Sequence, residues 1–178
     1  LQHQDGHSHV LANTIPNCKA YDPAYGYEMA VVIRHGMKEM FEDNQNVFYY
    51  LTIENENYEQ PAMPKDSEDG IIKGMYKFES VETKGRKKSP RVQLLGAGSI
   101  MNEVRAAAQM LKDDWGVASD VWSVTSYNEL ARDGQHVERW NHLHPDDKPR
   151  KAYVTQCMED AQGPVVSSTD YIKLHSEQ

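Results

Sequence analysis

The sequence of 178 residues is poor in cysteine, in basic residues and in long apolar runs. Its two cysteines, Cys18 and Cys157, form no C-x-x-C pair and are too few for a disulfide framework, so we expect a protein of the reducing cytoplasm. The net charge of −8 disfavours a nucleic-acid partner, because phosphate binding needs a basic field. No apolar run approaches the roughly 20 residues that span a bilayer, so we expect neither a membrane segment nor a signal peptide.

The first half of the chain predicts a loop, a helix and a strand. Residues 1–20 are expected to form a polar loop. Asp22 is a suitable N-cap and Pro23 a suitable first helical residue, which predicts a helix that ends near residues 42–44. Residues 47–52 are β-branched and aromatic and predict a buried strand. A helical turn and a further strand are expected within residues 71–81.

A basic segment separates this half from a series of compact βα units. Residues 84–91 hold Gly, Pro and a run of Lys and Arg, which favours a solvated linker over a patch for an anionic partner. Beyond it we expect strands at 92–95, 117–125, 153–158 and 165–166, and helices at 100–113, 128–132 and 135–143. This alternation predicts an α/β fold with a parallel sheet.

Two motifs in the second half are weak candidates for binding sites. The turn Gly96-Ala97-Gly98 follows a strand and precedes a helix, but Met101 stands where a dinucleotide fingerprint needs a third small residue. We interpret the turn as a matter of backbone geometry, although Asp120 is a possible ribose ligand. The segment with His136, His142 and His144 matches no standard zinc spacing and is interpreted as a solvated helix and loop.

The opening residues are the strongest candidate for chemistry. His3, His7 and His9 fall within seven positions around the turn Asp5-Gly6. In an extended loop His7 and His9 point to the same side, and an imidazole exchanges protons near its unperturbed pKa of about 6.5. The residues alone leave three possibilities open: acid–base chemistry, metal binding, or hydrogen bonds that only hold a loop.

Residues 1–9 (LQHQDGHSH) and 21–28 (YDPAYGYE) resemble the homodimeric pyruvate dehydrogenase (acetyl-transferring) component of bacteria. That family is thiamine diphosphate-dependent and belongs to the transketolase-like superfamily. Further segments that match it are 56–58, 95–100, 123–126, 128–134 and 168–171, so the resemblance covers essentially the whole chain. It implies a partial pyrimidine-binding domain followed by a partial transketolase C-terminal-like parallel-sheet domain. The expected divisions are residues 1–82, a basic linker at 83–91, and residues 92–178.

The resemblance also implies roles for the opening loop. The family's Asp-Gly-x-x-His loop reaches the active site, which makes His9 the leading candidate to contact the substrate or the thiamine-bound intermediate. His7 and His3 are alternatives, and Asp5 belongs to the same loop. The implied roles are to hold the pyruvate-derived carboxylate, or to move a proton during reductive acetylation of the lipoyl group. His rather than Pro after the glycine favours the pyruvate enzyme over transketolase.

Departures from the family pattern limit what the chain does alone. The Gly-Asp-Gly…Asn motif that binds thiamine diphosphate through Mg²⁺ does not occur in this sequence, so we expect an internal fragment that is inactive when isolated. The implied partners are pyruvate, a lipoyl-bearing acetyltransferase component and a second identical subunit, in a cytoplasmic enzyme that links glycolysis to acetyl-CoA. The alternatives are a transketolase-like or 2-oxoglutarate-type enzyme, or a non-catalytic assembly module.

Overall fold

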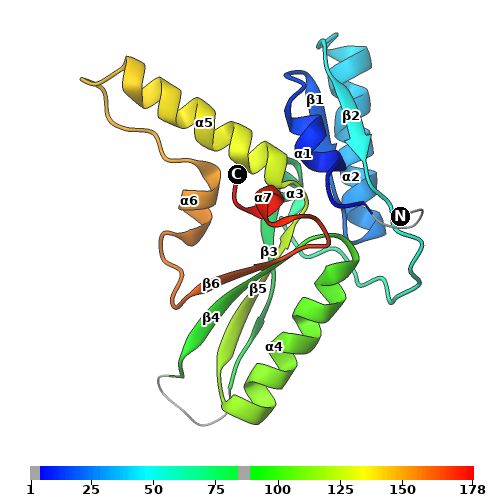
Figure 1. Ribbon diagram of the computed structural model, residues 1–178, viewed down its shortest axis with the longest axis vertical. Helices are drawn as coiled ribbons and strands as arrows, with labels where there is room; N and C mark the ends of the chain where they lie inside the picture. Colours follow the sequence, from blue (N-terminus) through cyan, green and yellow to red (C-terminus); the bar gives the residue numbers. More distant parts are fainter. Residues whose placement is uncertain (1–4, 84–88) are drawn as a thin grey trace.

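Two sheets form the framework of the computed structural model, which describes residues 5–83 and 89–178 (Figure 1). In the smaller sheet, β1 (Cys18–Tyr21) and β2 (Phe48–Leu51) pair in parallel. The larger sheet has the order β3-β5-β4-β6 and consists of β3 (Met75–Val81), β4 (Arg91–Gly96), β5 (Ala118–Val124) and β6 (Val165–Ser168). β4 is parallel to both of its neighbours, whereas β3 is antiparallel to β5, so the α/β fold is mixed with mainly parallel pairing.

Helices cover both faces of the larger sheet (Figure 1). On one face α4 packs Met101, Val104 and Ala108 against β4 and β5, and on the other α5 and α6 cover Leu95 and Trp122. The helical segments are α1 (Ser8–Asn13), α2 (Gly26–Met37), the π-helical η1 (Lys38–Glu42), α3 (Glu68–Lys73), the 3₁₀-helical η2 (Gly98–Ile100), α4 (Met101–Trp115), α5 (Tyr127–Leu143), α6 (Tyr153–Met158) and α7 (Lys173–Ser176). Within the described residues, none of these helices is long and apolar enough to cross a membrane.

The central strands and α4 confirm the sequence predictions. Every residue of β5 is buried, as expected for a strand with a neighbour on each side and helices on both faces. Gln93 of β4 is also fully buried, and its amide is satisfied by Trp122 Nε1 at 2.8 Å and Asp120 Oδ2 at 3.1 Å. The predicted helix at 100–113 corresponds to α4, which ends at Gly116 in the left-handed conformation (φ 64°).

Several predictions for the first half are wrong. Residues 1–20 were expected to be a loop, but the described part contains α1 and β1. The next helix begins at Gly26, not at Pro23 with Asp22 as its cap, because the backbone N–H of Asp22 donates to Thr125 O at 2.8 Å and continues the line of β1. The strand predicted at 47–52 exists as β2, but it is half-exposed because its pairing in the described chain is with β1 alone.

Two predictions in the second half are also wrong. The strand predicted at 153–158 is helix α6, whose first N–H is bonded to Asp133 Oδ2 at 2.6 Å. The apolar residues of this segment fit a helix as well as a strand, and they face the other helices and Trp122. The helices predicted at 128–132 and 135–143 are a single helix, α5, because Gly134 continues the helix rather than breaking it.

The larger sheet takes strands from both sides of the predicted linker. β3 precedes residues 84–91 and β4 begins at Arg91, yet both strands flank β5. Residues 84–88, which carry most of the basic run, lie outside the described residues. The division into residues 1–82 and 92–178 therefore stays a prediction, with β3 belonging structurally to the second sheet.

Candidate functional site around His9

Asp5 starts the helix that carries the candidate histidine. Its carboxylate accepts from the backbone N–H of His7 at 3.1 Å and of Ser8 at 3.0 Å, and also from the Ser8 hydroxyl. These bonds satisfy the N–H groups of His7, the N-cap, and of Ser8, the first residue of α1. Burial tends to raise the pKa of Asp5, but the hydrogen bonds from Ser8 and His7 outweigh it and lower that pKa. The sequence-predicted Asp5 therefore acts on the helix and not directly on a ring.

His7 and His9 are separated by this helix. His7 is exposed, whereas His9 is 1% exposed, so the expectation that both point to one side is wrong. The ring of His9 packs against Tyr171 and His175, with centroids 4.7 and 5.0 Å away, and against Tyr50 at 5.5 Å. Burial lowers the pKa of His9 to about 4, with the charge of Asp5 opposing the shift, so the ring is neutral at neutral pH.

A chain of two hydrogen bonds leads from the His9 ring to a buried carboxyl. His9 Nε2 lies 2.8 Å from Thr52 Oγ1, and the Thr52 hydroxyl donates to Asp22 Oδ1 at 2.6 Å. Asp22 is 3% exposed. Burial raises its pKa to about 7, and the negative charges of Glu54 and Asp170 add to the rise. Asp22 thus titrates close to neutral pH beside a histidine that does not.

A second histidine from the far end of the chain completes the cluster. His175 of α7 is 1% exposed, and its Nε2 has no hydrogen-bond partner within the described residues. Its ring contacts those of Tyr127 and Tyr171, each with a centroid 5.0 Å away. Burial, with a contribution from His9, lowers the pKa of His175 to about 4. Figure 1 shows α7 beside α1, near the N-terminal end of α5.

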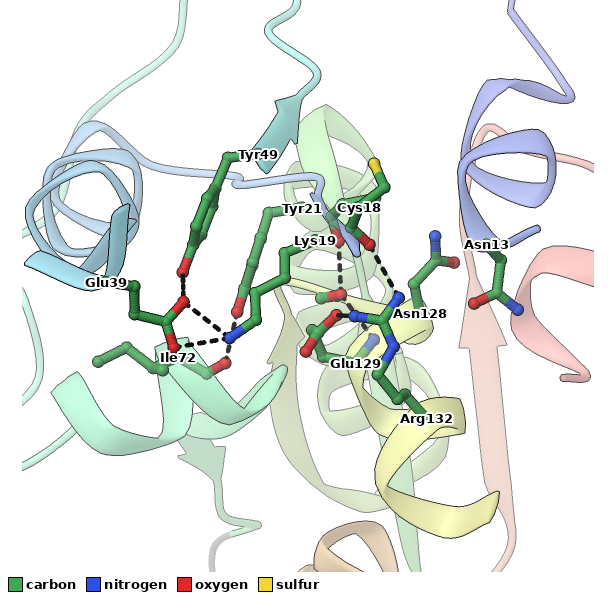
Figure 2. Close-up of polar contacts among 12 residues, drawn as sticks. Asn13, Cys18, Lys19, Tyr21, Glu39, Tyr49, Ile72, Asn128, Glu129 and Arg132 are labelled. Carbon is green, nitrogen blue, oxygen red and sulfur yellow. Dashed lines mark hydrogen bonds and ion pairs between the residues drawn. The ribbon is translucent and has the colours of Figure 1, made fainter. Parts of the chain in front are cut away.

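The seam between β1 and the start of α5 holds these segments together (Figure 2). Ser126 caps α5 by accepting from the N–H of Glu129 at 3.0 Å, and its hydroxyl donates to Ala20 O of β1 at 2.6 Å. Arg132 donates to Glu129 and to Cys18 O, both at 2.8 Å. Asn128, beside them, donates to His9 O at 2.8 Å. The first turn of α5 therefore fixes both β1 and the backbone of His9.

A separate polar cluster lies on the outer side of β1 (Figure 2). Lys19 Nζ is 2.8 Å from both carboxylate oxygens of Glu39, and the Tyr49 hydroxyl donates to the same carboxylate at 2.5 Å. Burial tends to raise the pKa of Glu39, but these donors outweigh it and lower that pKa. The cluster ties β1 and β2 to the π-helical η1, away from His9.

Among the described residues, the histidines in and just after α5 do not join the His9 cluster. His3 lies outside the described residues. His136, His142 and His144 lie along or just after α5, and His144 stacks on Trp140 with a centroid distance of 4.3 Å. In residues 5–83 and 89–178, no group of three or more His, Cys, Asp or Glu side chains is placed to hold a metal ion.

Four residues of the cluster escaped sequence reasoning. Asp22 was interpreted as a helix cap, Tyr171 was noted only as part of the matching segment 168–171, and Thr52 and His175 carried no motif of their own. Asp22 and Thr52 are 30 positions apart and meet because they follow the paired strands β1 and β2. The sequence could have indicated this pair, because polar residues that directly follow neighbouring parallel strands lie close together.

Family models match almost the whole chain. The model described as "Pyruvate dehydrogenase E1 component middle domain" matches residues 1–61. The model described as "Transketolase-like TK C-terminal domain" matches residues 74–178, which is more than half of the chain.

Comparisons with single proteins agree with these matches. The chain is 58% identical over 178 residues to the pyruvate dehydrogenase E1 component of Pseudomonas aeruginosa, and 57% identical over 180 residues to that of Escherichia coli K12. All of the chain is covered in both cases, but it spans 20% of the length of each relative. Two crystal structures of transketolase from Pichia stipitis have TM-scores of 0.53 and 0.52, each at 18% identity over 94% of this chain and 23% of theirs, which shows a shared fold.

Proposed function

The chain belongs to the transketolase-like TK C-terminal domain family, and from this premise we propose that it is part of a pyruvate dehydrogenase E1 component. The observation that carries the proposal is the 58% identity to such a component over all 178 residues. Since the chain spans 20% of that relative, the activity belongs to a longer polypeptide that contains it. That polypeptide decarboxylates pyruvate and transfers the two-carbon unit to the lipoyl group of an acetyltransferase component, in the cytoplasm and as a dimer of identical subunits.

We assign the site role in this chain to His9, with His7, His3 and Asp5 as the alternatives. His9 is supported by its hydrogen bond to Thr52 and by its place where α1, β2 and α7 meet. A neutral imidazole donates from one nitrogen and accepts at the other, so it suits holding a carboxylate or moving a proton. Since the ring is 1% exposed, contact with a substrate requires the segment with Tyr171 and His175 to move away from it.

Thiamine diphosphate and Mg²⁺ are the cofactors that we propose for the longer polypeptide. Within residues 5–83 and 89–178 no set of three His, Cys, Asp or Glu side chains converges, so we assign no residue of this chain to the diphosphate or its metal. When bound, the thiamine ring supplies the stabilisation of the carbanion, while a protein supplies orientation and electrostatics. We therefore derive no step through the cofactor, and assign to this chain the positioning of one imidazole.

The test replaces His9 by Ala and by Gln in the full-length polypeptide. Decarboxylation of pyruvate is measured with an artificial electron acceptor, and acetyl transfer with a lipoyl domain. We expect acetyl transfer to fall by roughly 100-fold or more, the usual contribution of a positioned acid or base. His136→Gln, at an exposed position of α5, is the matched control and should leave both rates unchanged. Unchanged rates in both His9 variants would refute the role.

A second candidate function is assembly without catalysis. Ile33, Met37 and Phe41 recur every four residues along α2 and η1 and are 44%, 56% and 74% exposed. Such a stripe is typical of a surface that another protein segment covers. The His9 variants of the full-length polypeptide separate the two functions, because wild-type activity in both would support the structural module. Calorimetry of this chain with thiamine diphosphate and MgCl₂ adds a second check, since micromolar binding would contradict a purely structural module.

The choice of substrate also needs a direct test. A transketolase-like or 2-oxoglutarate-type activity is the alternative to the pyruvate enzyme. Turnover by the full-length polypeptide of pyruvate, 2-oxoglutarate and a ketose phosphate distinguishes the three classes. We expect pyruvate to have the highest kcat/KM, and a higher value for either of the others would reassign the substrate.

A further inference from the structure

Two hydrogen bonds in series connect the His9 ring to Thr52 and Thr52 to Asp22, and each has a defined donor and acceptor. A threonine hydroxyl has a single proton to donate. Thr52 Oγ1 lies 2.6 Å from Asp22 Oδ1 but 3.4 Å from the alternative acceptor, Tyr21 O. When Asp22 is ionised, this short contact makes its carboxylate the acceptor of that proton. The Thr52 oxygen then faces His9 Nε2, 2.8 Å away, as an acceptor.

We propose that Thr52 and Asp22 are positioning residues for His9, which fix the proton on Nε2 and leave Nδ1 as the basic nitrogen of the ring. The inference rests on the proposed role of His9. It adds two residues that touch neither substrate nor cofactor and act through the orientation and tautomer of the imidazole. A third group that orients a catalytic base is a recurrent arrangement in enzymes.

The backbone around Asp22 explains why its carboxyl is available for this task. Its N–H donates to Thr125 O at 2.8 Å, and its carbonyl accepts from Gly98 N at 3.2 Å. These bonds attach Asp22 to the ends of β5 and β4 in the larger sheet, while Thr52 continues β2 in the smaller one. The pair therefore joins elements of both sheets directly behind the His9 ring.

Gly98 leaves the space that the carboxyl occupies. A Cβ at this position would lie 2.8 Å from Asp22 Oδ2 and 2.9 Å from Glu54 Oε1, closer than real contacts permit. The glycine also has φ 52°, a conformation that side chains disfavour. The backbone conformation thus favours glycine, and a side chain here would require the Asp22 and Glu54 carboxyl groups to shift.

The charge on Asp22 determines which group donates and which accepts in the two hydrogen bonds that join His9, Thr52 and Asp22. The ionised carboxylate can only accept, so Thr52 must donate to it and accept from His9. A protonated Asp22 could donate to Thr52, which would then donate to Nε2 and move the ring proton to Nδ1. The titratable groups that face this pair are Asp5 before α1, Tyr50 on β2, Glu28 on α2, Tyr127 on α5, and Glu54, Asp170, Tyr171 and His175.

The experiment uses the full-length polypeptide with Thr52→Val, Thr52→Ser and Asp22→Asn. Thr52→Val keeps the shape and removes the hydroxyl, whereas Thr52→Ser keeps the hydroxyl. We expect Thr52→Val to lower kcat by roughly tenfold or more with little change in KM, since a misplaced base loses much of its contribution. Asp22→Asn should also lower kcat, and Thr52→Ser should stay within about twofold of wild type. Thr155→Val, an exposed threonine on α6, is the matched control.

A second readout reports on His9 itself. Deuterium exchange at the imidazole C2 position, followed by mass spectrometry of the peptide with His9, gives the pKa of this ring. Thr52→Val should lower it, because the Nε2–H loses its acceptor and the charged ring is less favoured. Unchanged kcat and unchanged His9 exchange in Thr52→Val and Asp22→Asn would overturn the proposal. A loss of kcat in Thr52→Ser as large as that in Thr52→Val would also overturn it. Activity retained in His9→Gln would instead refute the proposed function, while the exchange readout would still decide whether the pair holds the ring.

Discussion

Replacing Asp22 by Asn should change how the stability of the protein depends on pH. The pKa of Asp22 rises from an ordinary 3.8 to about 7, chiefly because the carboxyl is buried. Between these two values the folded state binds a proton that the unfolded state has already released. The stability due to this group is therefore fully present below about pH 4 and is lost as the pH rises through about 7. Asn is close to Asp in size but cannot titrate, so the substitution removes the ionisation with little change in packing.

The size of the effect follows from the same two pKa values. Each pKa unit corresponds to about 1.4 kcal/mol, so the free energy of unfolding of wild type relative to Asp22→Asn should fall by about 3 kcal/mol between pH 4.5 and 7.5. His9 and His175 titrate in the opposite sense. Their pKa values are lowered to about 4, so their contribution is present above about pH 6.5 and lost as the pH falls. Both histidines remain in the variant, and their contribution cancels in the difference.

Urea unfolding of the chain at four pH values between 4.5 and 7.5, followed by tryptophan fluorescence, measures this difference. Trp122 is 6% exposed and reports on the core that surrounds β5. Asp114→Asn, at an exposed position near the end of α4, is the matched control and should give a difference that does not change with pH. A difference for Asp22→Asn that also stays constant, within about 0.5 kcal/mol, would refute the reasoning that burial raises this pKa.

Three further substitutions, two of them with a matched counterpart, test the packing around the site by the same unfolding measurement. Glu28→Ala removes the acceptor of two buried hydroxyls and two backbone N–H groups and should cost about 3–5 kcal/mol, whereas exposed Glu138→Ala should change little. A loss of stability below about 1 kcal/mol in Glu28→Ala would contradict the expectation that four buried donors are left unpaired. Ser126→Ala removes the cap of α5 and the bond to β1 and should cost about 1–2 kcal/mol, while equal stability would show that water replaces both. Gly74→Ala should cost roughly 1–3 kcal/mol, because φ is 107° and the added Cβ would lie 2.5 Å from a carbonyl oxygen. Gly134→Ala, in the interior of α5, should instead stabilise by up to about 1 kcal/mol.

The parts of the fold that the sequence predicted correctly have strong local signals. β4 and β5 are largely apolar runs and α4 has apolar residues at a helical period, and glycines stand at the end of β4 and just after α4. Local pattern and tertiary environment therefore agree. β1 was missed because four residues show no alternation, and its pairing partner lies about thirty residues away. α6 was predicted as a strand because its β-branched and aromatic residues suit either structure, and only the surface on which it packs decides between them.

The candidate site was predictable only where a single residue carried the signal. The clustered histidines drew attention to His9, but its surroundings come from segments that sequence spacing does not connect. Thr52 follows β2, Asp22 follows β1, and Tyr171 and His175 lie more than 160 positions beyond His9. Burial could not be foreseen either, since a polar Asp-Gly turn indicates exposure. The helix that Asp5 caps carries His9 inward instead.

The turn Gly96-Ala97-Gly98 shows how a motif can be necessary for a reason other than the one it suggests. The sequence permitted a phosphate site there, and Met101 argued against it. In the structure Met101 is fully buried against β4, so the third position of the motif is used for packing. Gly98 is used for the approach of Asp22, whose carboxylate would repel a phosphate at the same place. Gly98, which would approach the bound anion in a phosphate site, here leaves room for the Asp22 carboxylate. This carboxylate accepts the hydrogen bond from Thr52, which in turn contacts His9.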